Sequence, residues 1–230
     1  MRQVVLDTET TGINPQLGHR IIEIGCVELI DRKLTGKHYH TYVNPERMVE
    51  AEAIGVHGIT NEFLVDKPLF QDVAQEFYEY IKGSELVIHN AAFDVGFINH
   101  EFNLLVSKIK PVEEYCEVLD TLAMARKKHP GQKNNLDALC RRYGINNSHR
   151  ELHGALLDAE ILADVYLLLS GGQTALLLDK EGGGSGASGR RRISSDRLPL
   201  NIVRATDEEM QAHQEYLESV KKSAGALVWD

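Results

Sequence analysis

The sequence predicts an α/β fold in which a mixed sheet, an antiparallel three-strand meander extended by parallel strands, is flanked by helices. Residues 1–43 contain strand-like runs joined by short polar segments, which favour antiparallel pairing. Beyond residue 70 the apolar pattern takes the period of a helix, and helices then alternate with short strands. Strands that alternate with helices join a sheet in parallel, so the second half is expected to extend the meander.

The predicted elements follow the chain in that order. Strands are expected at residues 4–10, 20–29 and 37–43, and the polar segment DRKLTG joins the last two. The later elements are helices at 70–83, 91–105, 134–143 and 154–169 and buried strands at 85–90 and 115–121. Together they form a first domain, residues 1–172.

A flexible linker and a short helical tail are predicted beyond this domain. Glu181–Gly189 reads EGGGSGASG, a composition typical of flexible chains, so residues 173–197 are assigned to a linker. In the tail, residues 198–230, Thr206 and Glu209 have the spacing of a capping box, and an apolar stripe follows. A helix of about 15 residues is marginal by itself in water, so its stripe is expected to bind a partner protein, which the glycine linker lets it reach, and the chain's own body is the alternative.

Composition indicates a globular protein of the cytoplasm. The 230 residues are 43% hydrophobic, which suffices for a sizeable core. No apolar run approaches the ~18 residues of a membrane span, and no signal-peptide pattern precedes the first strand, so no membrane-bound part is expected. Cys26, Cys116 and Cys140 are widely spaced and are interpreted as reduced, packed thiols.

The charge distribution separates an acidic body from a basic strip. The formal net charge is −9, which by itself argues against nucleic acid as a partner, because phosphate binding relies on excess Lys and Arg. Residues 126–150 nevertheless carry seven basic side chains against Asp137 alone, whereas residues 1–125 carry 10 basic and 20 acidic ones. This strip suits weak engagement of a strand end, and a solvated helix face is an equally good interpretation.

Two carboxylates stand at the end of the first predicted strand, in the stretch VVLDTETTG. Side chains alternate along a strand, so Asp7 and Glu9 are expected on one face with their charges close together. Like charges this close are costly unless a cation lies between them, and paired carboxylates suit Mg²⁺ or Mn²⁺. A solvent-exposed strand end explains the pair equally well when the pair is taken alone.

A third acid, Asp94, heads the apolar stripe of the helix predicted at 91–105. It directly follows a buried strand that ends at His89 and Asn90, and such strand ends are where α/β sites commonly form. A helix N-cap is the alternative role for Asp94. His89 is interpreted equally well as a packing residue beside Asp94 or as a substrate contact.

The fourth acid, Asp158, shares the core-facing side of the last predicted helix of the domain, where an uncompensated carboxylate would cost several kcal/mol. His153, near the start of that helix, is a natural general base. Four acids and one histidine from separate elements suit two-metal phosphodiester hydrolysis, in which two cations about 4 Å apart activate a water and stabilise the leaving oxygen. His153 is then expected to take the proton from that water.

Three motifs resemble those of the DEDDh 3′ to 5′ exonucleases, and within that family those of the proofreading subunits of bacterial DNA polymerase III. They are DTETTG at residues 7–12, HNAAFD at 89–94 and HGALLDA at 153–159. The resemblance covers about the first 172 residues. It implies that residues 1–172 form a 3′–5′ exonuclease domain with a ribonuclease-H-like fold.

The resemblance also implies roles for individual residues. Asp7, Glu9 and Asp158 would ligate two divalent metal ions, Mg²⁺ or Mn²⁺, Asp94 would complete the site partly through water, and His153 would be the base. The segment EAIGVHGIT at 52–60 is similar too, and it implies that Glu52 and His57 contact the terminal nucleotide, although a structural loop histidine is the alternative for His57. Thr10 is expected, by similarity, to contact the 3′ end.

Two partner-binding segments are implied beyond the domain. The sequence GGQTALLL at 171–178 resembles a sliding-clamp peptide, with Gln173, Leu176 and Leu178 as its anchors, and the frayed end of a helix is the alternative. The tail at 198–230 corresponds to the segment that holds the catalytic alpha subunit of the polymerase. The linker and Arg190-Arg191-Arg192 match no motif of the family.

The expected function is therefore the proofreading of DNA synthesis by removal of 3′-terminal nucleotides as 5′-mononucleotides. The polymerase and the clamp would keep the DNA 3′ end local, which accommodates the acidic net charge. Two alternatives remain: an RNA-processing exonuclease of the same fold and a noncatalytic structural subunit. The tethered tail argues against the first, and the complete acid cluster argues against the second.

Overall fold

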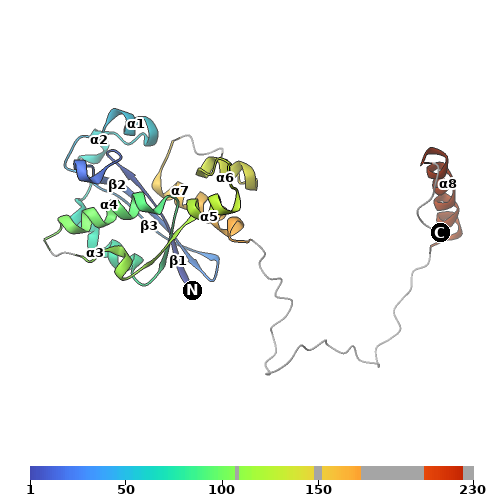
Figure 1. The fold of residues 1–230 in the computed structure, drawn as a ribbon, viewed down its shortest axis with the longest axis horizontal. Coiled ribbons are helices and arrows are strands. Elements are labelled where there is room, and N and C mark those ends of the chain that lie inside the picture. Colours follow the sequence, from blue (N-terminus) through green and yellow to red (C-terminus); the bar gives the residue numbers. More distant parts are fainter. Residues whose placement is uncertain (107–108, 148–151, 172–204, 225–230) are drawn as a thin grey trace, which may run out of the picture. The chain divides into compact units, whose positions relative to one another are not determined.

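The computed structural model describes residues 1–106, 109–147, 152–171 and 205–224, and Figure 1 shows how the chain runs through them. The chain divides into two compact units, Met1–Leu178 and Asp179–Asp230. The predicted linker at 173–197, with Gln173, Leu176 and Leu178, lies outside the described residues. Within the described ranges, no helix combines the length and apolar character needed to cross a membrane.

The first unit is built on a five-stranded sheet with the strand order β3-β2-β1-β4-β5. The strands are β1 (Arg2–Thr10), β2 (Ile21–Ile30), β3 (Lys33–Tyr42), β4 (Glu85–Ile88) and β5 (Glu117–Asp120). β2 pairs antiparallel with both β1 and β3, whereas β4 pairs parallel with β1 and β5 pairs parallel with β4. The predicted mixed sheet is confirmed, with strand ends displaced by a few residues.

The described residues of the first unit form seven α-helices, and four of these are expected from the sequence. These are α3 (Phe70–Ile81), α4 (Ala91–Leu104), α6 (Leu136–Tyr143) and α7 (Ala155–Leu169). The unexpected ones are α1 (Ala51–His57), α2 (Asn61–Leu64) and α5 (Thr121–Lys128). The expectation that His57 lies in a loop is wrong, because His57 is the last residue of α1, a short helix that contains one glycine and stops at another, Gly58, whose φ is 72°. α5 buries only Thr121 and Ala125, too few positions to reveal a helical period.

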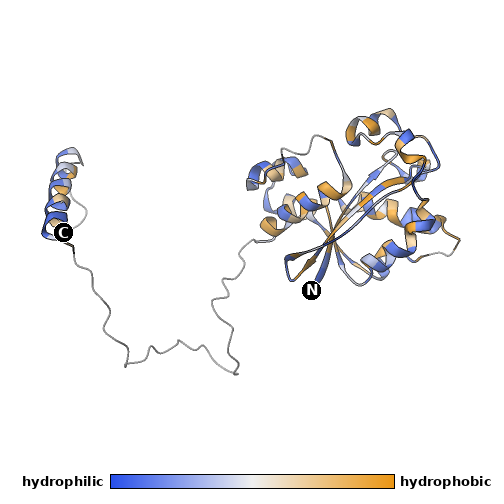
Figure 2. Cartoon of the chain, turned by 180° about the vertical axis from the view of Figure 1, so that it is seen from behind, coloured by the Kyte–Doolittle hydropathy of each residue, from blue (hydrophilic) through white to orange (hydrophobic). Residues whose placement is uncertain are grey.

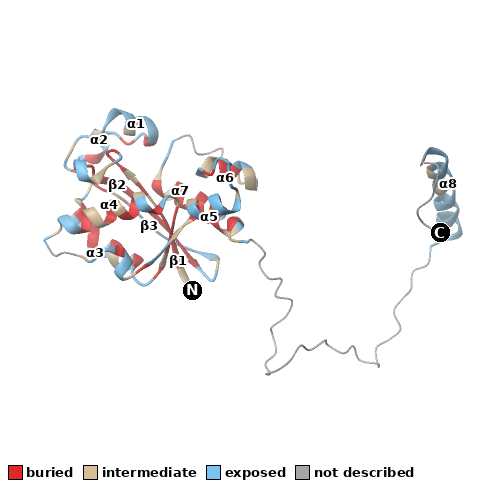
Figure 3. Cartoon of the chain, viewed as in Figure 1, coloured by how far each residue is buried: buried red, intermediate tan, exposed pale blue. Residues whose placement is uncertain are grey.

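Two layers of helices cover opposite faces of the sheet. Successive side chains of β1 point to opposite faces and so contact different layers. Val4 and Leu6 are fully buried in one core cluster, which contains the phenylalanines of α3 and α4. Val5 is fully buried in another, with Ala159 and Leu162 of α7. Buried segments line the sheet and the inner sides of these helices (Figure 3), where orange, hydrophobic residues also gather (Figure 2). The cysteines are free and buried, as predicted.

The second unit holds α8 (Asp207–Ala224), the predicted tail helix. Its capping box is present: the Glu209 N–H donates to the Thr206 hydroxyl at 3.3 Å, and the Thr206 N–H donates to the Glu209 carboxylate at 2.8 Å. Met210 and Tyr216 are 56% and 68% exposed. The helix therefore leaves large apolar side chains in contact with solvent.

Candidate active site

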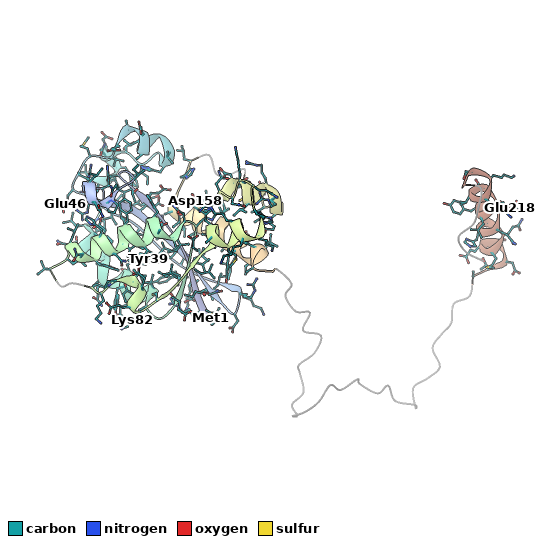
Figure 4. All side chains as sticks on the ribbon, viewed as in Figure 1. Met1, Tyr39, Glu46, Lys82, Asp158 and Glu218 are labelled. Atoms are coloured by element: carbon teal, nitrogen blue, oxygen red, sulfur yellow. The ribbon has the colours of Figure 1, made fainter. Side chains whose placement is uncertain are left out.

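A cavity of about 250 Å³ lies where β1 and β4 end and α6 and α7 begin. Figure 4 labels Asp158 near the start of α7. The lining residues are Asp7, Thr8, Glu9, His89, Asn135, Leu136, Asp137, His153, Asp158 and Leu162. A larger cavity of about 540 Å³, beside Arg2 and Cys116 at the other end of β1, holds none of the predicted site residues. The smaller cavity is therefore the candidate active site.

Three of the predicted residues converge in this cavity. Glu9, His153 and Asp158 each offer a ligand atom, and these atoms all lie within 4.8 Å of one another. The His153 Nδ1 atom lies 3.6 Å from an oxygen of Asp158. Asp7 lines the same cavity. Three carboxylates around one small space suit a hard divalent cation such as Mg²⁺ or Mn²⁺, which prefers oxygen ligands.

The alternation of β1 explains this convergence. Asp7 and Glu9 continue the face of β1 on which Val5 packs against α7. Asp158 is in the first turn of α7 and is only 4% exposed. The helix macrodipole favours a carboxylate at that position by roughly 0.3–1 kcal/mol. Strand and helix thus present acidic side chains to each other across the cavity.

Gly25 allows α7 to approach the sheet closely enough for this contact. Gly25 lies on β2 and pairs with Asp7 of the neighbouring strand β1. A Cβ atom added to Gly25 would lie 2.2 Å from the backbone carbon of Ala155, the first residue of α7. Any side chain at this position would therefore push the start of α7, and Asp158 with it, away from β1.

We expect Gly25→Ala to lower the free energy of unfolding by about 1–3 kcal/mol, the usual cost of overpacking. Gly96→Ala is the matched control, because a Cβ atom at Gly96 in α4 meets nothing within 4 Å beyond its own helix, and the change should be neutral or stabilise by roughly 0.5–1 kcal/mol. Urea denaturation of both variants measures the difference. Equal stability of the two variants would contradict the role assigned to Gly25.

Asp94 is held on the opposite face of β1. Thr8 points away from Asp7 and Glu9, and its backbone N–H and its hydroxyl both donate to one oxygen of Asp94, at 3.1 and 2.7 Å. Burial raises the pKa of Asp94 to about 7, while the bonds from Thr8 act to lower it. Asp94 thus fixes the strand between the two carboxylates and is not part of the cavity lining. Asn90 is the N-cap of α4, so the alternative cap role for Asp94 is wrong.

Glu52 and His57 lie on α1, and neither residue lines the cavity. α1 touches the loop that carries the predicted base, since the His153 N–H donates to the Val56 carbonyl at 3.2 Å. The Nδ1 atom of His57 accepts the Ile59 N–H at 3.0 Å, which places the ring proton on Nε2. His57 is 5% exposed, and burial lowers its pKa, so the neutral ring is favoured.

Thr10 and His89 are both held by local contacts. The Thr10 hydroxyl donates to the Gly12 carbonyl at 2.6 Å and so fixes the turn that follows β1. The Nδ1 atom of His89 lies 2.9 Å from the Thr121 hydroxyl at the start of α5. Burial lowers the pKa of His89, which keeps the ring neutral at the edge of the cavity.

Some lining residues are not predicted from the sequence, namely Thr8, Asn135, Leu136, Asp137 and Leu162. Asn135 is the N-cap of α6, where its side chain accepts the Ala138 N–H at 3.0 Å. An asparagine three residues before Ala138 is a recognisable cap signal. The sequence does not show, however, that this cap lies beside β1, because that contact depends on how α6 packs on α7.

Comparisons with known proteins show the family to which the chain is similar. Residues 4–166 match the exonuclease family of the RNase T type. The DNA polymerase III subunit epsilon of Escherichia coli is 54% identical and covers 99% of this chain and 97% of its own length. The subunit of the same name from Haemophilus influenzae is 52% identical and covers 100% of this chain and 94% of its own length.

Solved structures share the fold. Exonuclease X in complex with 5′-overhanging duplex DNA has a TM-score of 0.58 at 29% identity, over 75% of this chain and 95% of its own. Apo exonuclease I has a TM-score of 0.61 at 18% identity, over 74% of this chain and 42% of its own, which is a likeness of fold alone. Because the family match spans most of the chain and the curated relatives match nearly all of it, the chain belongs to the exonuclease family and, within it, to the epsilon subunits of DNA polymerase III.

Proposed function

We propose that the chain removes the 3′-terminal nucleotide of a DNA strand by hydrolysis and releases it as a 5′-mononucleotide. It thereby proofreads the DNA synthesis of DNA polymerase III in the cytoplasm. The observation that carries this proposal is the convergence of Glu9, His153 and Asp158 within 4.8 Å, in a chain of the epsilon family. Acids with a histidine beside them are the groups that metal-assisted phosphodiester hydrolysis requires.

In the proposed mechanism, Asp7, Glu9 and Asp158 hold two divalent cations, Mg²⁺ or Mn²⁺. When bound, such ions supply an activated water and charge stabilisation for the departing oxygen. His153 accepts the proton of the attacking water, because its imidazole lies at the cavity beside Asp158. Asp94 keeps β1 in position through Thr8.

The terminal nucleotide is proposed to lie between the acid cluster and α1. Glu52 and His57 of α1 are then its neighbours, and burial favours the neutral ring of His57. The turn that Thr10 closes with Gly12 lies at the end of β1, on the same side. His89 is proposed as a further contact, because it lines the cavity.

The test compares a 3′-mismatched DNA primer with a matched RNA oligomer, in Mg²⁺ and in chelator, for wild type and Asp7→Ala. We expect the wild type to shorten the DNA in Mg²⁺ only, and Asp7→Ala to lose this activity. Intact DNA would refute the proposal. Degradation of RNA in preference to DNA would favour the RNA-processing alternative, and full activity of Asp7→Ala would argue against the assigned site.

We also propose that the tail at 198–230 binds the alpha subunit of the polymerase. The exposed Met210 and Tyr216 on α8 support this, because a short helix with uncovered apolar side chains needs a partner. A chain that ends near residue 180 is expected to keep exonuclease activity and to lose co-purification with alpha. Undiminished co-purification would rule out the tail as the binding segment.

A clamp-binding role is proposed for Gln173, Leu176 and Leu178, on the sequence pattern alone. Replacement of these residues by alanine in the full chain is expected to reduce binding to the sliding clamp in a pull-down assay. Binding to alpha is the internal control and should be unaffected. Equal clamp binding by the variant and the wild type would exclude this segment.

A further inference from the structure

Two helices beside the cavity carry exposed cations. α5 and α6 pack on α7 through buried residues such as Ala125 and Leu139, so their polar side chains face outward. Figure 3 shows exposed, pale blue segments along both helices. The exposed basic residues of α5, α6 and the loop between them include Arg126, Lys127, Lys133 and Arg141, which we call the basic track.

The basic track lies in a region of strong positive charge. Between residues 121 and 147 there are six basic side chains, and Asp137 is the only acidic one. Two of the six are engaged elsewhere, because Lys128 donates to the Leu169 carbonyl at 2.8 Å and Arg142 donates to the Asn134 side chain at 3.1 Å. The four residues of the track make no ion pair with another described residue.

The loop between α5 and α6 is fixed by internal hydrogen bonds. Asn134 is 7% exposed and donates to the carbonyls of His129 and Gln132 at 3.1 and 3.0 Å. Arg142 closes the loop from the other side by donating to the Lys133 carbonyl at 2.8 Å. These contacts fix the backbone of the loop at Lys133. Lys133 is two residues before Asn135, which lines the cavity.

The track begins at the cavity and leads away from it. α6 starts with lining residues, and α5 starts at Thr121, whose hydroxyl contacts the lining residue His89. α6 has 8 residues and an α-helix rises about 1.5 Å per residue, so the basic end of α6 lies about 12 Å from its start. The basic end of α5 is held near the start of α6, because Asn134 donates to the His129 carbonyl. A strand with its 3′ end in the cavity can therefore pass along these cations.

We propose that the basic track binds the phosphates of the DNA strand upstream of the 3′-terminal nucleotide. This inference rests on the proposed function, since it assigns the path of the substrate that the cavity cleaves. Fixed cations next to an acidic cavity draw the phosphates to α5 and α6 and leave the terminal linkage at the acid cluster. The track explains how a protein with a net charge of −9 holds a polyanion.

The test measures the binding of a fluorescently labelled single-stranded DNA in chelator, where no cleavage occurs. The variant Arg126→Gln, Lys127→Gln, Lys133→Gln, Arg141→Gln is compared with the control Lys33→Gln, Lys37→Gln, Lys82→Gln, Lys110→Gln, which removes the same charge from exposed positions elsewhere. We expect at least about 10-fold weaker binding for the track variant only. The slope of log K against log salt should become shallower by about 0.7 for each phosphate that the variant no longer neutralises.

A second measurement separates this proposal from the proposed function. Hydrolysis of an aryl ester of a nucleoside 5′-phosphate, which has no upstream phosphates, should be the same in wild type and in the track variant. If the wild type does not hydrolyse the ester, the proposed function is refuted. The binding measurement would still decide whether the basic track binds DNA. Equal weakening in the control variant, or unchanged binding in the track variant, would overturn the proposal. So would displacement of the DNA by polyglutamate at equal charge concentration, which would indicate an acidic protein partner.

Discussion

Asp158→Asn is expected to lower kcat by about 10³-fold or more, and to abolish the stabilisation by Mn²⁺ that we expect for the wild type. A metal ion contributes several kcal/mol to the stabilisation of charge in such a reaction, and about 4 kcal/mol corresponds to about 10³-fold in rate. Asp158 is 4% exposed and shares the cluster with Glu9 and His153, so under the proposed function its carboxylate would bind the cation directly. The asparagine has nearly the same shape but lacks that charge.

In chelator, the same substitution should leave the stability of the protein unchanged or raise it. Without a cation, the carboxylates of Asp7, Glu9 and Asp158 repel one another, so removal of one charge relieves the folded state. We expect the Tm of Asp158→Asn to equal or exceed that of the wild type in chelator. In Mn²⁺ at about 100 times its Kd, the wild type alone should gain about 2.7 kcal/mol.

Asp164→Asn is the matched control for this prediction. Asp164 lies on the same helix α7 but is exposed and is not part of the cavity lining. Its substitution should leave both kcat and the Mn²⁺-dependent rise in Tm unchanged. A normal rise in Tm with Mn²⁺ in Asp158→Asn would show that Asp158 is not a metal ligand.

The sheet and the pairing of the first carboxylates are predictable from the sequence, because both depend on local alternation. The run Val4-Val5-Leu6 predicts a strand buried on both faces, and the spacing of Asp7 and Glu9 predicts that they share a face. These predictions need no knowledge of how the helices pack. Short helices are not predictable in this way. α1, for example, has two glycines in or next to it and too few apolar positions to show a helical period.

The assembly of the site depends on contacts between distant elements, and these are not visible in the sequence. Asp94 and Asp158 both lie in first turns of helices, yet α4 and α7 cover opposite faces of the sheet, so only Asp158 lines the cavity. The approach of α7 depends on Gly25, which is an ordinary strand glycine until Ala155 is seen against it. His57 likewise changes from a predicted loop residue to a buried one at the end of α1.

The role of His153 can be separated from that of the metal ligands. His153 belongs to the same cluster as Glu9 and Asp158, so geometry alone allows it to be either a ligand or a base. A general base contributes roughly 10²–10⁴-fold to the rate, whereas it contributes nothing to the binding of the cation in the absence of substrate. The two roles therefore give different results when activity and metal binding are measured on the same variant.

We expect His153→Ala to lower kcat by roughly 10²–10⁴-fold while it retains the Mn²⁺-dependent rise in Tm. The loop should keep its place, because its anchor to α1 is the backbone bond from His153 to the Val56 carbonyl, which the substitution leaves intact. His38→Ala, at an exposed position of β3, is the control and should change none of these quantities. A lost Tm response to Mn²⁺ in His153→Ala would instead make His153 a metal ligand and leave the attacking water to another base.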